Sequence, residues 1–376
     1  MKKLHNPGTP CKIERKGSYN LSGIIGNKLE AVKCSEGWGL FGNGEFWVSD
    51  EELKELRTSR SIGIFNPSPF NLNGWGFYSP INLEIELTKK CNQQCIHCWN
   101  ESGKDTFIQN DILKEIINEF RSYGGQRLKI TGGEPLEYFS LFDFLAYSKS
   151  QGVKTIELTT NGSLINEGTA KDLSKYVSRI NISLHGATEE THNKITRSQN
   201  YHKTKKAIEF CNQYGLETII NFTVMEENKK EVKEIFKIAK NYGNKIRFNL
   251  LMQRGFGKEL RDISPEIFQL RKAISNLSKL YNVPLEKSDL YPIGYNLNIE
   301  FYKFYGCGAL RDSMYISSKG LALPCNLATR AIGDIYEDSV REIWGGEKAK
   351  EIRKITLCEK DLCTFSCSGK CKAKRI

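Results

Sequence analysis

The sequence predicts an α/β protein whose core is a partial (β/α)6 barrel, with a small N-terminal α+β appendage and a Cys-rich C-terminal domain. Three observations predict this class. Six apolar stretches with strand character alternate with helical segments between residues 81 and 251, and repeated strand–helix units connect parallel strands by right-handed crossovers. Short strand and turn signals precede them, and six of the 12 cysteines lie after residue 300.

A chain of 376 residues is long enough for two or three domains, and we place the boundaries to give 1–79, 80–260 and 261–376. The formal net charge of +11 is interpreted mainly as a lysine-rich solvated surface, with part of the surplus balancing anionic metal sites. The mean hydropathy is −0.46, no apolar run reaches about 18 residues, and residues 1–7 lack an apolar signal region. We therefore expect a cytoplasmic protein without membrane contact.

Residues 1–79 are predicted to form a small domain of short strands. Residues 20–32 have hairpin character, residues 45–48 are a further strand candidate, and residues 49–56 have the cap and spacing of a short helix. A linker rich in Asn, Pro and Gly, residues 66–80, marks the boundary. Such a domain either packs against the core or binds a peptide by adding it to a sheet edge.

The core strands are predicted from six apolar runs of strand length. They span residues 81–87, 127–131, 154–160, 179–184, 216–224 and 245–251. Between them, residues 109–123 and 228–242 each place apolar side chains on one helical face and end at a glycine, Gly124 and Gly243 respectively. Six such units predict a curved sheet that closes only partly.

Unusual residues follow the end of each predicted strand. Three cysteines within eight residues, Cys91, Cys95 and Cys98, follow the first strand, and Gly-Gly-Glu-Pro at 132–135 follows the second. The later loops contain Asn161, then Ser183 and His185, then Asn228, and finally Arg254. Because active sites lie at the carboxyl ends of parallel barrel strands, we expect these loops to form one functional edge.

The loop with three cysteines predicts metal binding. Thiolates are soft ligands suited to Zn, Cu(I) or Fe–S centres, and short spacers let one loop curl around a compact inorganic body. A closed zinc site or an electron-transfer cluster requires four ligands, so three cysteines leave one metal position open for chemistry. A zinc half-site is the main alternative. A disulfide is disfavoured because the cytosol keeps thiols reduced.

The C-terminal segment, 261–376, is rich in Tyr, Gly and Cys and has one helix candidate at 339–350, interrupted by Gly345-Gly346. Its cysteines predict a metal framework. They are Cys307, Cys325, Cys358, Cys363, Cys367 and Cys371. A zinc knuckle or ribbon formed by the last three is the alternative.

The pattern Cys91-x3-Cys95-x2-Cys98 after a first strand, followed by Gly-Gly-Glu-Pro after a second, resembles the radical S-adenosylmethionine (SAM) superfamily through about residue 255. The resemblance implies that the three thiolates bind three irons of a [4Fe–4S] cluster and that SAM chelates the fourth through its amino and carboxylate groups. Reductive cleavage of SAM then yields methionine and a 5′-deoxyadenosyl radical, which takes hydrogen from an unactivated carbon. His97 stands where many members carry an aromatic residue.

The resemblance also implies a set of SAM-binding residues in the loop after the second strand. Gly132 and Gly133 would let the backbone approach the methionine moiety. Glu134 would pair with the ammonium group, and Pro135 completes the loop.

Further SAM contacts are implied on the later strands. Ser183 takes the ribose- or carboxylate-binding position, and Arg197 takes the position that holds the methionine carboxylate. Asn161 and Arg254 complete the predicted cofactor site. No residue is assigned as the catalytic acid, base or radical partner.

The C-terminal segment resembles the auxiliary-cluster extension called SPASM and its shorter relative twitch, because Cys307, Gly320 and Cys325 agree with their opening motif. The later cysteines depart from the SPASM pattern in their spacing. Six ligands can serve one auxiliary [4Fe–4S] cluster or two, and we favour two. The family's interleaving then implies one cluster on Cys307, Cys325 and Cys371 and an outer cluster on Cys358, Cys363 and Cys367.

The function implied is modification of a ribosomally synthesised precursor peptide, by a thioether or carbon–carbon crosslink or by epimerisation, with residues 1–79 binding its leader. An external reductant of the flavodoxin or ferredoxin type would supply electrons. The alternatives are formylglycine formation as in sulfatase maturases, which carry Asp where this chain has Asn326, and dehydrogenation of a sugar or aminoglycoside. From another class, a zinc-stabilised nucleic-acid-binding protein would fit the net charge, although we do not expect nucleic acid as a partner.

Overall fold

A computed structural model describes the chain mainly over residues 79–100, 105–261, 263, 266–286, 309–310 and 312–358, together with six short strands before residue 78. For those early strands, and for residues 267–268 and 354–358, only the backbone is described. In these parts of the chain no helix is both long enough and apolar enough to pass through a lipid bilayer.

The six early strands form two small antiparallel sheets. One sheet has the order β1 (Ser18–Asn20), β2 (Glu30–Cys34), β3 (Gly37–Phe41) and β4 (Glu45–Val48), and the other pairs β5 (Phe70–Asn71) with β6 (Gly76–Phe77). The pairing of Asn20 with Glu30 confirms the predicted hairpin, and β4 confirms the second strand candidate. The predicted helix at 49–56 lies outside the described residues.

The core is a nine-stranded sheet with the order β12-β11-β10-β9-β8-β7-β13-β14-β15. Its parallel part consists of β7 (Asn82–Glu86), β8 (Arg127–Thr131), β9 (Thr155–Thr160), β10 (Arg179–Ser183), β11 (Glu217–Val224) and β12 (Lys245–Leu250). All six predicted core strands are confirmed to within one residue. The sheet does not close, which confirms the partial barrel.

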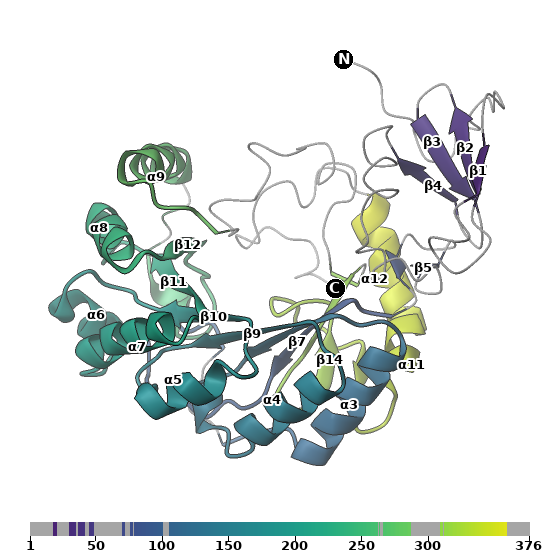
Figure 1. Cartoon of the computed structure of the whole chain (residues 1–376), viewed down its shortest axis with the longest axis horizontal. Helices are drawn as coiled ribbons and strands as arrows, with labels where there is room; N and C mark the ends of the chain where they lie inside the picture. Colours follow the sequence, from purple (N-terminus) through teal and green to yellow (C-terminus); the bar gives the residue numbers. More distant parts are fainter. Residues whose placement is uncertain are drawn as a thin grey trace.

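Helices cover the convex face of this sheet (Figure 1). They are α3 (Asn110–Ser122), α4 (Leu141–Ser150), α5 (Glu167–Leu173), α7 (Tyr201–Gln213), α8 (Val232–Tyr242) and α9 (Ile267–Tyr281). The helix α6 (Glu189–Thr196) lies instead at the carboxyl edge of the sheet, where Ile195 packs with Met225 and Leu251. Three short 3-10 turns lie beside them: η2 (Pro135–Glu137), η3 (Lys229–Glu231) and η4 (Gly255–Glu259). The predicted helices at 109–123 and 228–242 are confirmed, although η3 forms the first turn of the second one.

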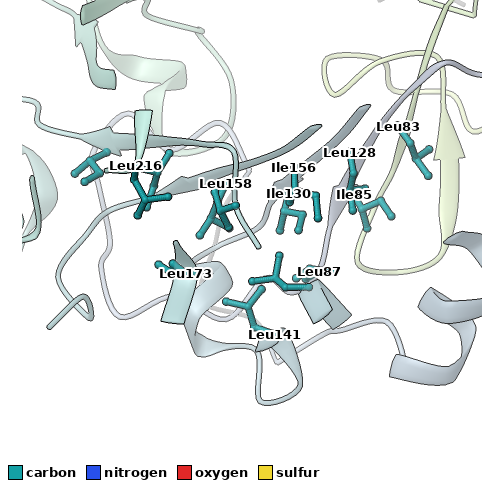
Figure 2. Close-up of a cluster of buried hydrophobic side chains, with 14 of the residues drawn as sticks. Leu83, Ile85, Leu87, Leu128, Ile130, Leu141, Ile156, Leu158, Leu173 and Leu216 are labelled. Atoms are coloured by element: carbon teal, nitrogen blue, oxygen red, sulfur yellow. The ribbon is translucent and has the colours of Figure 1, made fainter. Parts of the chain in front are cut away.

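The two faces of the sheet differ in chemistry. Alternate strand residues that face the helices are apolar and buried, as Figure 2 shows for Leu83, Ile85, Leu128, Ile130 and Leu158. Burying one such side chain contributes about 1.5–3 kcal/mol, and the layer between sheet and helices forms the large hydrophobic core of the described residues.

The concave face carries charged and amide side chains instead. Neighbouring strands place Glu84, Lys129, Glu157, Arg179 and Glu217 in one row of alternating charge. Lys129 Nζ lies 3.1 Å from Glu84, and Arg179 Nε lies 3.1 Å from Glu217. Burial alone would raise the pKa of Glu157, but the nearby cations, Arg247 foremost, lower it below its usual range. The concave face is therefore a polar surface rather than a second hydrophobic core.

The C-terminal segment continues the same sheet. β13 (Ser313–Ile316) pairs in parallel with β7, and β14 (Leu321–Leu323) and β15 (Gly333–Asp334) follow as antiparallel strands. Hydrogen-bonded pairing therefore crosses from the predicted core domain into the predicted C-terminal domain. No local sequence pattern indicates that β13 lies beside β7.

The predicted helix at 339–350 is two helices, α11 (Val340–Gly345) and α12 (Glu347–Cys358). Ser339 begins α11 with a capping box, in which its hydroxyl accepts from the backbone of Glu342 while the Glu342 side chain accepts from Ser339 N. Gly346 has an extended backbone, with φ −66° and ψ 160°, and so separates the two helices.

Candidate active site

The loop with the three cysteines follows β7 at the carboxyl edge of the sheet. Its backbone is held from two sides. Ile96 N donates to Ile195 O at 2.9 Å at the end of α6, and Phe256 N, from the loop after β12, donates to Cys98 O at 2.9 Å. The first, fourth and sixth strand units therefore meet at this loop, as the sequence predicts.

Glycines after β12 allow the close approach to the cysteine loop. Gly255 has φ +57°, and a Cβ atom there would lie 2.5 Å from Cys98 O and 2.7 Å from Trp99 O. A Cβ atom on Gly257 would lie 2.9 Å from Met252 O and 3.2 Å from His97 O. A larger residue at Gly255 would collide with backbone atoms that have little freedom to move. The sequence places Gly255 in a special loop but does not indicate this contact.

The three thiols are half-buried and close enough to influence one another. Burial, followed by the neighbouring thiols of Cys98 and Cys91, raises the pKa of Cys95 well above its usual range. Cys95 Sγ lies 3.5 Å from Gln93 Oε1. Several thiolates crowded together in this way are stabilised by binding a metal centre, which removes their mutual repulsion.

The chemistry of these donors fits an iron–sulfur cluster. In the part of the chain that the structure describes, no three His, Cys, Asp or Glu side chains converge closely enough to hold a single metal ion. The assignment of Cys91, Cys95 and Cys98 to a cluster therefore rests on their number, their spacing and their confinement to one loop.

The loop after β8 packs directly on the residues that lead into Cys91. Gly133 N donates to Thr88 O at 2.6 Å, and Glu134 N donates to Lys90 O at 2.8 Å. A Cβ atom on Gly132 would lie 2.7 Å from Thr88 O, and one on Gly133 would lie 2.3 Å from Lys90 O. Both glycines are thus required for contact between the two loops. The predicted approach to the methionine moiety is a separate role and stays a prediction.

The Glu134 side chain is fully buried and already has three donors. It accepts from Thr160 Oγ1 at 2.6 Å, from Asn161 N at 2.7 Å and from Leu136 N at 3.2 Å. Burial raises the pKa of Glu134 to about 7 although these hydrogen bonds oppose the change. Pro135 begins the short turn η2 that Glu134 caps. The carboxylate therefore ties β9 to this loop, and its predicted pairing with an ammonium group stays a prediction.

Two further predicted SAM contacts lie at the same edge. Asn161 Nδ2 donates to Asn92 Oδ1 at 2.8 Å, which links the loop after β9 to the cysteine loop. Ser183 is the last residue of β10, half-buried on the polar face and in register with Asn221 of β11. The Asn221 side chain accepts from Asn249 Nδ2 at 2.6 Å.

The two predicted arginine contacts lie in different surroundings. Arg197 ends α6 in the left-handed conformation, with φ +50°, and its side chain is exposed in a surface hollow lined also by Glu189, Asn193 and Lys194. Arg254 Nη1 donates to Leu327 O at 2.9 Å in the C-terminal segment. Arg254 thus connects the barrel rim to the residues after Cys325.

Three neutral histidines pack together at the cysteine loop. His97 lies within the loop and His185 in the loop after β10, both of which the sequence indicates as unusual, whereas His192 on α6 is not indicated. The rings of His97 and His185 meet edge to face at 4.4 Å. His185 Nδ1 accepts from Thr223 N at 3.2 Å, and His192 Nδ1 accepts from His185 N at 3.2 Å. Burial lowers the pKa of His97 and of His192 to about 4. These rings therefore add no positive charge beside the thiols at neutral pH.

Of the predicted auxiliary-cluster ligands, Cys325 is the one whose side chain is described. It is half-buried after β14, and the next residue, Asn326, donates through Nδ2 to Glu84 Oε1 at 3.3 Å. The backbone of Cys358 ends α12. The other predicted ligands lie outside the described residues. They are Cys307, Cys363, Cys367 and Cys371.

Two family models match the sequence. That of the Radical SAM superfamily matches residues 85–239, and that of the SPASM iron–sulfur cluster-binding domain matches residues 307–372, a span that contains all six C-terminal cysteines. The fold and site thus define an enzyme class that binds iron–sulfur clusters and SAM. The chain is a radical SAM enzyme with a C-terminal SPASM domain.

Relatives of known activity differ in what they act on. The AdoMet-dependent heme synthase of Methanosarcina barkeri is 27% identical over 326 residues, which are 79% of this chain and 92% of that protein. The subtilosin biosynthesis protein AlbA of Bacillus subtilis is 26% identical over 309 residues, 78% of this chain and 67% of AlbA. The GTP 3′,8-cyclase of Clostridium perfringens is 33% identical over 200 residues, half of this chain, and the match spans only 61% of the cyclase.

Solved structures share the fold at low sequence identity. SuiB of Streptococcus suis, bound to its precursor peptide SuiA, superposes with a TM-score of 0.66 at 18% identity over 86% of this chain and 77% of SuiB. The enzyme anSMEcpe, bound to AdoMet and the Cp18Cys peptide, superposes with a TM-score of 0.59 at 18% identity over 79% of this chain and 95% of anSMEcpe.

Proposed function

We propose that this enzyme modifies a ribosomally synthesised precursor peptide, by forming a thioether or carbon–carbon crosslink or by epimerising a residue. The observation that carries the proposal is the likeness in fold to SuiB, a protein solved with a precursor peptide, over 86% of this chain. The similarity to AlbA, a bacteriocin biosynthesis protein, points to the same substrate class.

In this proposal, Cys91, Cys95 and Cys98 hold a [4Fe–4S] cluster whose open iron is chelated by SAM. When bound, the pair supplies a 5′-deoxyadenosyl radical that removes hydrogen from carbon. The residues proposed to bind SAM are Gly132, Gly133, Glu134, Pro135, Asn161, Ser183, Arg197 and Arg254. An external flavodoxin or ferredoxin supplies the electron, and the location is the cytoplasm.

The polar concave face is the proposed surface for the peptide. Asn221 and Asn249 lie at the carboxyl edge of β11 and β12, and amide side chains can both donate to and accept from a peptide backbone. The alternating charges of Glu84 and Lys129 lie on the same face. For the leader, β1 and β4 are the edge strands of the first small sheet, and an extended peptide can add to such an edge.

Auxiliary clusters on the six C-terminal cysteines, from Cys307 to Cys371, are proposed to accept an electron from the substrate radical or to bind a substrate thiolate. Two clusters are preferred to one.

Formylglycine formation is the second candidate, and the likeness to anSMEcpe with its bound peptide favours it. Asn326 argues against it, because an amide cannot take up a proton as the Asp of the maturases can. A GTP cyclase and a heme synthase are also among the relatives, so the test must be able to detect a small-molecule substrate.

The test is an anaerobic assay of the reconstituted enzyme with dithionite, SAM and the peptide encoded by the nearest short reading frame. We expect 5′-deoxyadenosine together with a peptide whose mass falls by a pair of hydrogen atoms, or one that gains deuterium from D2O. A cysteine-containing sulfatase peptide converted to formylglycine would instead establish the second candidate. Formation of 5′-deoxyadenosine only with a nucleotide, a sugar or a porphyrin precursor would refute a peptide substrate.

A further inference from the structure

Glu86 is a buried carboxylate that the proposed chemistry does not use. It is the last residue of β7, and 1% of its surface is exposed. Oε2 accepts from Asn100 Nδ2 at 2.7 Å and from Tyr315 OH at 2.5 Å. Oε1 accepts from Ser318 N at 3.2 Å and from Ser318 Oγ at 2.5 Å. Each oxygen is thus matched by two donors, which suits a carboxylate because its oxygens only accept.

The donors come from two parts of the chain that both carry cysteines. Asn100 follows Cys98 by two residues, whereas Tyr315 and Ser318 lie on β13 and in the turn that leads into β14 and Cys325. Tyr315 and Glu86 are 229 residues apart in sequence. One carboxylate therefore joins the cysteine loop of the barrel to the Cys325 segment.

Three neighbouring contacts also join the barrel to the segment around Cys325. Thr106 Oγ1 lies 3.1 Å from Ser318 Oγ, Asn326 Nδ2 donates to Glu84, and Arg254 donates to Leu327 O. All three contacts connect the barrel to the segment on either side of Cys325. Strand pairing with β7 would hold β13 in register, but it would not fix the turns that follow it.

We propose that Glu86 is a positioning residue that locks the Cys325 segment against the cysteine loop and so fixes the auxiliary cluster relative to the SAM-binding cluster. The inference rests on the proposed assignment of Cys325 as an auxiliary-cluster ligand. A carboxylate suits this role because hydrogen bonds are directional. The bonds that Glu86 accepts from three side chains and a backbone amide define one orientation of the Cys325 segment, which apolar packing would not do.

The test compares Glu86→Gln with Glu157→Gln in the reconstituted full-length enzyme. Glu157 is a matched control, since it is also buried on a core strand and accepts from Asn181 and Arg247, which lie on β10 and β12. In Glu86→Gln the new amide group faces donors, whichever way it turns. We measure iron and sulfide content, the reduction potential of the auxiliary cluster, and the distance between reduced clusters by pulsed electron paramagnetic resonance.

We expect Glu86→Gln to broaden the inter-cluster distance distribution, to shift the auxiliary potential and to lose auxiliary iron, while the signal of the SAM-binding cluster is retained. Glu157→Gln should lower thermal stability without any of these changes. If Glu86→Gln does not fold, Tyr315→Phe removes one donor with little loss of packing and should produce a smaller broadening.

The inference would be overturned if the inter-cluster distance distribution of Glu86→Gln, or of Tyr315→Phe, were the same as that of the control Glu157→Gln. The proposed function would then remain intact. A wild-type enzyme that binds one cluster only would overturn both the inference and the proposed auxiliary clusters. The iron and sulfide content of the wild type distinguishes these two failures.

Discussion

Replacing Glu134 by Gln tests the role that the structure gives to this buried carboxylate. In the native chain two backbone amides, Asn161 N and Leu136 N, and one hydroxyl donate to it. The glutamine amide group can take the place of either oxygen, and in both orientations it leaves one buried N–H without an acceptor. An unsatisfied buried donor costs about 1–3 kcal/mol, so we expect a loss of that size in the free energy of unfolding.

The pH dependence of this loss provides a sharper test. Burial raises the pKa of Glu134 from its ordinary value of 4.5 to about 7, so the folded state favours the protonated side chain. Its contribution to stability is complete below pH 4.5 and is lost as the pH rises through 7. The difference corresponds to about 3 kcal/mol. The penalty of Glu134→Gln should therefore be larger near pH 5 than at pH 8, by about 2–3 kcal/mol.

The measurement is urea unfolding followed by far-UV circular dichroism on metal-free protein, at both pH values. Glu137→Gln is the matched control. It alters a carboxylate three residues along that is partly exposed and pairs with the exposed Lys90, and surface ion pairs contribute only about 0–1 kcal/mol. Equal penalties for Glu134→Gln at the two pH values, or a penalty no larger than that of the control, would refute this account of Glu134.

Three further predictions concern the site. The triple replacement of Cys91, Cys95 and Cys98 by Ala should abolish 5′-deoxyadenosine formation and remove the SAM-dependent paramagnetic signal; cleavage that persists would contradict the assignment. Gly255→Ala should greatly reduce cluster occupancy, measured as bound iron, because its Cβ would lie 2.5 Å from Cys98 O, whereas Gly215→Ala has a similar positive φ but open space around it and should keep its iron. Asn228→Ala should cost about 3 kcal/mol in unfolding experiments because it removes hydrogen bonds to Met225 N and to the carbonyls of His185 and Thr223; a loss below about 1 kcal/mol would show that the loop rearranges without cost.

The sequence predicts the barrel well because its periodicity is local. Each strand from β7 to β12 is an apolar run of recognisable length, and each is followed by a loop of unusual composition, so both the strands and their functional edge can be read from the residues. The three cysteines are recognisable for the same reason, since their spacing within one loop is itself the signal.

Contacts between distant segments could not be predicted in this way. The pairing of β13 with β7 and the hydrogen bond from Tyr315 to Glu86 join residues more than two hundred positions apart. No local sequence pattern in either segment identifies the other as its partner. Glu134 illustrates a related difficulty. The motif predicts a contact with a ligand, but in the structure the Glu134 side chain also accepts hydrogen bonds from Thr160 and Asn161, which the motif does not indicate. His97, His185 and His192 become a group only once the fold brings them together.

The position of β13 also has a consequence for the solubility of the barrel. An open parallel sheet ends in a strand with unpaired backbone groups, and such an edge can recruit a strand from another chain. Here the edge of β7 is paired with β13, which β14 and β15 extend, so the segment that carries Cys325 takes up the backbone groups that β7 would otherwise expose. A truncated enzyme without this segment should therefore aggregate through its exposed β7 edge, and the segment is not an addition that the core could lose without harm.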